Sequence, residues 1–211
     1  MKKFKFIKPV PLAVFFILLF LLLSAVRIWL PEYAERAFNP VKEHPPWPVS
    51  EQARRLHQSL FIGDWHADSL LWDRNLLKRS DYGQVDFPRL RDGNVALQVF
   101  TAVTKSPSGL NYDENDSTAR DDITLIAIAE TWPVASWSSL FERAKYQAEK
   151  LTAYARKAPH EVKIIYRRQD LDELIAQRQN GSQLTGALLG MEGAHALEGN
   201  IENLDRLYRA G

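Results

Sequence analysis

The chain has 211 residues, 45% of them apolar and 25% charged, which is enough for one hydrophobic core of moderate size. It contains no cysteine, which excludes disulfides, thiolate zinc sites and a cysteine nucleophile, so any metal must be held by histidine and carboxylate side chains. Although the formal charge is +1, residues 32–211 carry 22 basic and 26 acidic residues, and this net charge of −4 predicts no binding to nucleic acid.

The N-terminal segment is basic and then strongly apolar. Residues 9–26 carry no charge and would form a helix of ~27 Å, close to the thickness of a bilayer core. We expect an uncleaved transmembrane anchor over residues 9–30, with the basic N-terminus, residues 1–8, in the cytoplasm and Trp29 and Tyr33 at the far interface. A cleaved signal peptide is the main alternative, but the apolar run exceeds the usual ~7–15 residues. A buried core helix is disfavoured because no polar face interrupts the run.

A proline-rich spacer over residues 31–50 is expected to connect the anchor to one α/β domain over residues 51–211. Strands are expected within residues 61–72, 94–103, 162–167 and 186–193. Helices are expected over residues 51–60, part of 117–131, 138–157, 170–179 and 200–211. Strands that alternate with helices predict a parallel sheet of four βα units, placed outside the cytoplasm by the anchor.

His66 and Asp68 stand at the end of the first apolar strand. The strand period of two points both side chains to the same side, so they could share one metal ion. Unpaired polar groups are costly beside a buried strand, which favours either metal ligation or a hydrogen-bonded His–Asp pair. An exposed loop is the third interpretation. The spacing alone leaves all three open.

Glu192 ends the fourth strand inside Gly-Met-Glu-Gly, where the flanking glycines let a ligand or backbone approach closely. It could face a functional site, or it could accept N–H bonds from the following turn. His195, three residues later, is expected to support a ligand or cap a turn rather than bind metal directly. His44, His57 and His160 are interpreted as ordinary surface histidines.

Motifs of several other enzyme classes are missing from the sequence. It has no Gly-x-Ser-x-Gly elbow, no Walker loop and no Gly-x-Gly-x-x-Gly, which argues against serine hydrolases, nucleotide hydrolases and dinucleotide-binding enzymes. The aromatic residues are scattered through expected strands and helices, so packing in the core explains them.

Three blocks together resemble one known family. Residues 63–75 (GDWHADSLLWDRN), 85–102 (VDFPRLRDGNVALQVFTA) and 188–211 (LLGMEGAHALEGNIENLDRLYRAG) are similar, in order and spacing, to the membrane dipeptidases, which are renal-dipeptidase-like zinc metallopeptidases. The resemblance covers about residues 51–211. It implies the N-terminal half of a (β/α)8 TIM-type barrel, preceded here by one transmembrane helix, with chemistry at the carboxyl ends of the strands.

The resemblance also implies roles for individual residues. His66 and Asp68 would bind one Zn²⁺ and Glu192 would bridge both ions of a complete two-zinc site, in which a metal-bridging hydroxide attacks the peptide bond of a dipeptide. Some relatives accept a D-residue at the second position. Metal-dependent amidohydrolases share a barrel, but their first motif is usually His-x-His, which differs from His66-Ala67-Asp68.

Relatives also use histidines and an aspartate from strands beyond the region that this chain matches. We therefore expect the chain to be the N-terminal part of a longer dipeptidase, inactive alone and completed by a missing C-terminal half or a homodimer partner. The alternative is a non-catalytic, membrane-tethered remnant or binding module of the same fold. In either case the domain is expected in the periplasm or at the cell surface.

Overall fold

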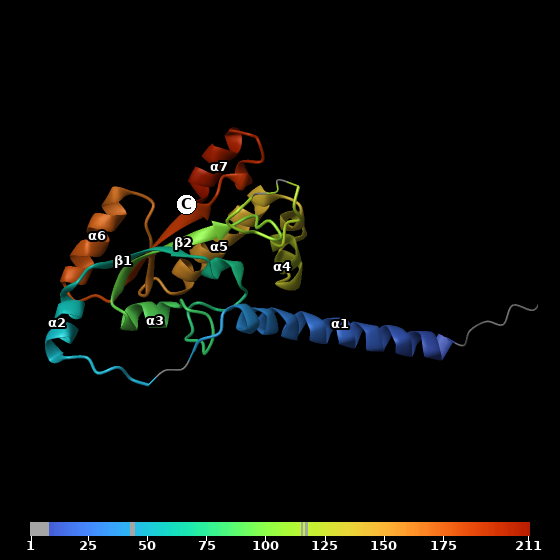
Figure 1. The fold of residues 1–211 in the computed structure, drawn as a ribbon, viewed down its shortest axis with the longest axis horizontal. Helices are drawn as coiled ribbons and strands as arrows, with labels where there is room; N and C mark the ends of the chain where they lie inside the picture. Colours follow the sequence, from blue (N-terminus) through green and yellow to red (C-terminus); the bar gives the residue numbers. More distant parts are fainter. Residues whose placement is uncertain (1–8, 43–44, 115, 117) are drawn as a thin grey trace, which may run out of the picture.

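The computed structural model describes residues 9–42, 45–114, 116 and 118–211, and Figure 1 shows a long helix leading away from an α/β domain. The expected basic N-terminus, residues 1–8, and His44 lie outside the described residues. The strands are β1 (Ile62–Ala67), β2 (Val95–Val103), β3 (Val162–Ile164) and β4 (Thr185–Glu192). The α-helices are α1 (Pro9–Phe38), α2 (Glu51–Ser59), α3 (Phe87–Asp92), α4 (Ile123–Ala129), α5 (Leu140–Lys157), α6 (Arg168–Gln179) and α7 (Glu202–Ala210). The short 3-10 helices are η1 (Ser69–Leu71), η2 (Val134–Trp137) and η3 (His195–Leu197).

The apolar N-terminal segment forms α1, which runs past the expected end of the anchor at residue 30. The helix passes through Pro31 and ends at Phe38, so the first part of the expected spacer is helical. Its last turns are held by the domain, since Arg74 donates to buried Glu35 over 2.7 Å and the ring of Phe38 stacks on a tryptophan. The stretch Leu12–Phe38 is long and apolar enough to cross a membrane, a property that a signal sequence shares.

The four strands form one parallel sheet, as the alternation of strands and helices predicted. Their order is β1-β2-β4-β3, with β2 and β4 paired along most of their length. A regular (β/α)8 barrel keeps its strands in chain order, so the position of β3 at the edge is a departure from the simple half-barrel pattern.

Of the α-helices that the structure describes, α3 alone was not expected from the sequence. The Asp86 side chain accepts a hydrogen bond from the backbone N–H of Arg89 over 2.9 Å. Pro88 occupies the first turn, where a backbone N–H would have no partner within the helix. At six residues, the helix is too short to show an apolar period.

Two faces of the sheet are covered by different helices. On one face, Phe100 of β2 packs with Phe87 of α3 and Leu151 of α5. On the other, Leu97 of β2 packs with Leu174 of α6. Glycine at 186 makes room for this contact, because a Cβ there would lie 2.4 Å from the end of the Leu174 side chain, which would have to move. At the carboxyl ends of β1, β2 and β4, this second face carries the candidate site.

Candidate metal centre

The carboxyl end of β1 brings two candidate ligands together. His66 lies on the strand and Asp68 directly follows it, with buried Ala67 between them turned to the other side. The distance from His66 Nε2 to Asp68 Oδ1 is 3.2 Å. The two side chains therefore share one side of the strand, as the period of two predicts.

Glu192 reaches the same place from the carboxyl end of β4. Strand β2 lies between β1 and β4, and its last residue, Val103, is in register with Glu192. Glu192 Oε2 lies 3.6 Å from His66 Nε2. One ligand atom from each of His66, Asp68 and Glu192 lies within 4.8 Å of the other two. The sheet thus gathers three residues that are up to 126 positions apart in the chain.

The middle strand holds Asp68 in position. The Thr101 hydroxyl on β2 donates a hydrogen bond to Asp68 Oδ1, and the backbone N–H of His66 donates to Asp64 Oδ1 over 3.2 Å. A carboxylate oxygen has two acceptor sites, so a bond from Thr101 leaves capacity for a metal. Thr101 was not among the residues expected at the site. The signal in the sequence was a hydroxyl residue within a mostly apolar strand, and the folded structure leaves it 5% exposed.

The donor set fits a divalent cation. Ligand atoms bound at ~2.1 Å to one tetrahedral zinc lie ~3.4 Å apart, and the separations from His66 Nε2 to the two carboxylates are 3.2 and 3.6 Å. One imidazole and two carboxylates are common zinc ligands, and two carboxylates balance the charge of the ion. The side chains of His66, Asp68 and Glu192 are 54%, 40% and 55% exposed, so small molecules can reach the cluster from solvent.

The end of α1 forms one wall of a cavity beside the cluster. This cavity of about 260 Å³ is lined by His66 and Asp68, by Glu35 of α1 and Asn39 just after it, and by Arg74, among others. Glu35 and Asn39 lie in the segment that was expected to be a spacer. No local pattern in the sequence indicates that they line a cavity. The helix thus contributes to the surroundings of the candidate site.

A second, polar cavity of about 410 Å³ lies between α1 and the domain. Burial raises the pKa of Glu130 to about 7, although its carboxylate accepts the Asp73 backbone N–H over 2.7 Å. Burial also lowers the pKa of nearby Lys150 to about 8, and its ammonium donates to the backbone carbonyl of Leu70 over 2.9 Å. These groups belong to the contact between α1 and the domain and are not among the three candidate ligands.

The remaining candidates lie apart from the cluster. His195 begins η3, is exposed and is not one of the three converging residues, and its supporting role stays a prediction. His57 and His160 are exposed, as expected for surface histidines. The side chain of Trp65 is directed to solvent and is 71% exposed.

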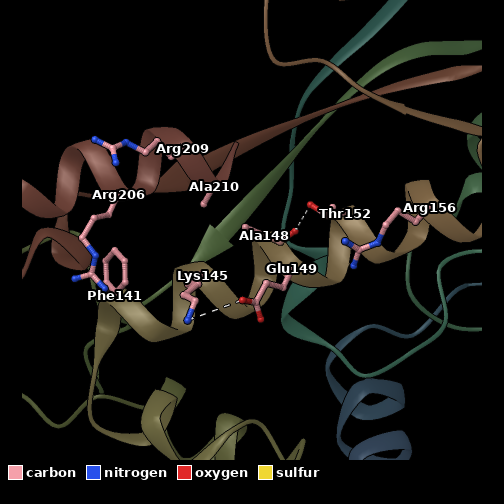
Figure 2. A pocket seen from close by; sticks show the side chains of 9 residues that line it. All are labelled: Phe141, Lys145, Ala148, Glu149, Thr152, Arg156, Arg206, Arg209 and Ala210. Carbon is pink, nitrogen blue, oxygen red and sulfur yellow. Dashed lines mark hydrogen bonds and ion pairs between the residues drawn. The ribbon is translucent and has the colours of Figure 1, made fainter.

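Figure 2 shows a further hollow, of about 390 Å³, between α5 and α7. Arg206 stacks on the ring of Phe141 at 3.8 Å, and Lys145 pairs with Glu149 at 3.9 Å. The cations around the hollow are Lys145, Arg156, Arg206 and Arg209. Its lining includes no histidine and one carboxylate, so it does not resemble a metal centre.

Comparison with known proteins identifies the family. The family model described as Membrane dipeptidase (Peptidase family M19) matches residues 50–211, which is most of the chain and includes all three converging residues. The chain belongs to the membrane dipeptidase family. A search of curated proteins found no match to it. Family membership supports a hydrolase that acts on dipeptides, and the family is one of metallopeptidases.

Proposed function

We propose that this membrane dipeptidase homologue binds zinc through His66, Asp68 and Glu192, and that the centre serves the hydrolysis of dipeptides. The observation that carries the proposal is the convergence of these three donor atoms within 4.8 Å at the carboxyl ends of parallel strands. Parallel α/β proteins place their chemistry at that end of the sheet. The family match over residues 50–211 supports the class of substrate.

Some side chains would bind the metal, and others orient these ligands. Zinc, when bound, supplies Lewis acidity and lowers the pKa of a coordinated water to ~7. Thr101 fixes the orientation of Asp68, and the backbone of His66 is held by Asp64. Glu192 has two carboxylate oxygens, so it would be able to hold a second ion as well in a complete site. The exposed side of the cluster admits the dipeptide.

The described residues bring together one group of three such ligands, which is enough for one ion. We therefore propose that the chain by itself holds a single zinc and does not hydrolyse dipeptides, because the second ion needs further ligands. We also propose that the sheet forms part of the wall of a (β/α)8 barrel. An experimental structure of the catalytically complete protein that shows an open sheet would contradict the barrel.

We further propose that α1 is retained as a single-pass anchor, with the N-terminus in the cytoplasm and the domain outside it. The cysteine-free sequence allows a direct test. A Gln177→Cys variant, with the new thiol on exposed α6, should react with a membrane-impermeant maleimide in intact cells. Reaction only after the cells are broken would place the domain in the cytoplasm.

Zinc binding is tested by equilibrium dialysis of the whole chain in detergent, followed by metal analysis. We expect about one zinc per chain, and its loss in His66→Ala, Asp68→Ala and Glu192→Ala. The matched control is His57→Ala, which removes an exposed histidine on α2 and should leave binding unchanged. A folded wild-type domain that retains no zinc would favour the alternative, a non-catalytic membrane-tethered module.

Recognition of the substrate is tested with cobalt in place of zinc. The visible absorption of cobalt reports changes around the ion, so a dipeptide that binds at the cluster should change the spectrum. A tripeptide of the same residues serves as the control. Equal responses to the two peptides would contradict a site specialised for dipeptides.

A further inference from the structure

Helix α4 presents an apolar face to solvent. Its sequence, ITLIAIA, carries no charge. Ile123 and Ala127 are buried against the domain, at 3% and 0% exposure, whereas Leu125 and Ile128 are 54% and 43% exposed. Residues three apart in a helix share a face, so Leu125 and Ile128 form one apolar face on the side opposite the domain core.

The orientation of α1 relative to the domain is fixed by several contacts. Arg74 and Glu35 form an ion pair over 2.7 Å, with their side chains 4% and 3% exposed. The rings of Phe38 and Trp72 stack with centroids 6.0 Å apart, and the Gly83 N–H donates to the carbonyl of residue 39 over 2.8 Å. The anchor helix is thus a packed part of the domain, and the domain cannot turn freely about it.

These contacts place the end of α4 at the height of the membrane surface. The apolar run of α1 ends at Val26, and Ile28 lies only ~3 Å further along the helix axis. Ile28 and Pro31 face Thr131, two residues after the end of α4, across one cavity. Exposed Trp29 lies at the same level, as expected for an aromatic residue at a membrane interface.

Figure 1 shows α4 roughly perpendicular to α1, beside the part of α1 that is nearest to the domain. The two helices are in contact. We propose that α4 is a second membrane contact, which lies along the bilayer surface with Leu125 and Ile128 among the lipids. The inference rests on the proposed insertion of α1 and does not depend on zinc. The helix carries no charged residue and presents Leu125 and Ile128 outward, so it can lie against lipid without burying a charge.

The consequence is a domain, with its candidate metal centre, held at a set height and angle above the bilayer. The loop that follows β1 begins beside His66 and Asp68. Further along, its residues Trp72 and Arg74 contact α1. Trp72 also packs with Ile123 and Ala127 of α4, so the loop after β1 connects the candidate metal centre to the proposed lipid contact.

The test uses single cysteines, since the chain contains none of its own. The whole chain carrying Leu125→Cys or Ile128→Cys is labelled with a fluorophore and reconstituted in phosphatidylcholine nanodiscs. Quenching is measured with spin-labelled lipids and with aqueous iodide. Leu22→Cys, within the span, is the reference for lipid contact, and Gln177→Cys on α6, at the opposite end of the domain, is the matched exposed control.

We expect the labels at 125 and 128 to be quenched by spin-labelled lipid several-fold more than the label at 177, and to be shielded from iodide. If they behave like the label at 177 while the label at 22 is quenched, α1 is inserted and the proposal is wrong. If the label at 22 is also unquenched, the anchor itself is wrong and the proposal falls with it. Shielding from iodide without lipid quenching means that protein covers the face, which also overturns the proposal.

These variants should bind zinc like the wild type, because α4 contributes no candidate ligand. A near-ultraviolet circular dichroism spectrum like that of the wild type confirms that each variant is folded, whether or not the chain binds zinc. Loss of the proposed metal site would leave the quenching pattern unchanged, so the two proposals fail separately.

Discussion

Replacement of Arg74 by methionine tests whether α1 is part of the domain. Arg74 is almost fully buried and donates to Glu35 Oε1 over 2.7 Å and to the carbonyl of Val85 over 2.9 Å. Arg74→Met keeps the apolar stem but leaves the Glu35 carboxylate buried without its cation. Breaking a buried ion pair by removing one partner costs about 3–5 kcal/mol. A chain of this size loses ~2–4 °C in Tm per kcal/mol, so we expect a drop of about 10 °C.

The assay is thermal unfolding of the whole chain in detergent, followed by near-ultraviolet circular dichroism. The double variant Arg74→Met with Glu35→Leu removes both charges and should recover most of the lost stability, because an apolar pair often replaces a buried ion pair at little cost. Arg168→Met is the matched control. Its ion pair with Asp172 spans 3.8 Å, and the arginine side chain is 92% exposed, so the Tm should not change. An Arg74→Met chain as stable as the wild type would refute the docking of α1.

Three further predictions concern buried polar groups. Buried Arg143 donates to the carbonyls of Ser136 and Thr104 over 2.7 Å each and pairs with Asp121, so Arg143→Met should lower the free energy of unfolding by about 3 kcal/mol or more in denaturant titrations. Burial near Asp73, Lys150 and Glu35 raises the pKa of Glu130 in the folded protein to about 7. The stabilisation from its protonated form is therefore present below pH ~4.5 and is lost as the pH rises through 7. Glu130→Gln should remove that part of the pH dependence of the Tm, and an unchanged profile would contradict the burial of the carboxyl group. Thr101→Val removes the donor to Asp68, so zinc should bind about 10-fold or more weakly in competition titrations, while an affinity equal to the wild type would show that Thr101 does not orient the ligand.

The apolar runs predicted all four strands, because buried parallel strands are apolar on both faces. Their ends depend on contacts that no local pattern encodes. β3 stops at Ile164, and not at the predicted residue 167, because the backbone N–H groups of Tyr166 and Arg167 donate to the Asp170 side chain at the start of α6. The strand order, with β3 at the edge, is likewise set by packing between distant segments.

The candidate ligands could be predicted because sequence motifs contain them. The residues that surround these ligands could not be predicted, because they come from other segments of the chain. The spacing of His66 and Asp68 on one strand, and of Glu192 at the end of another, follows from the sequence and the family resemblance. Thr101 and Glu35 join the surroundings of the site only because β2 pairs with β1 and α1 docks beside the first loop. Each is an ordinary polar residue in its local sequence, so only the folded structure shows its role.

The central claim is that His66, Asp68 and Glu192 hold one zinc ion. Diffraction data collected on both sides of the zinc absorption edge, from zinc-loaded crystals of the chain, locate the metal directly. One anomalous peak is expected at ~2.0–2.2 Å from His66 Nε2 and from an oxygen of each carboxylate. A peak at other side chains, or no peak in zinc-loaded crystals, would contradict it.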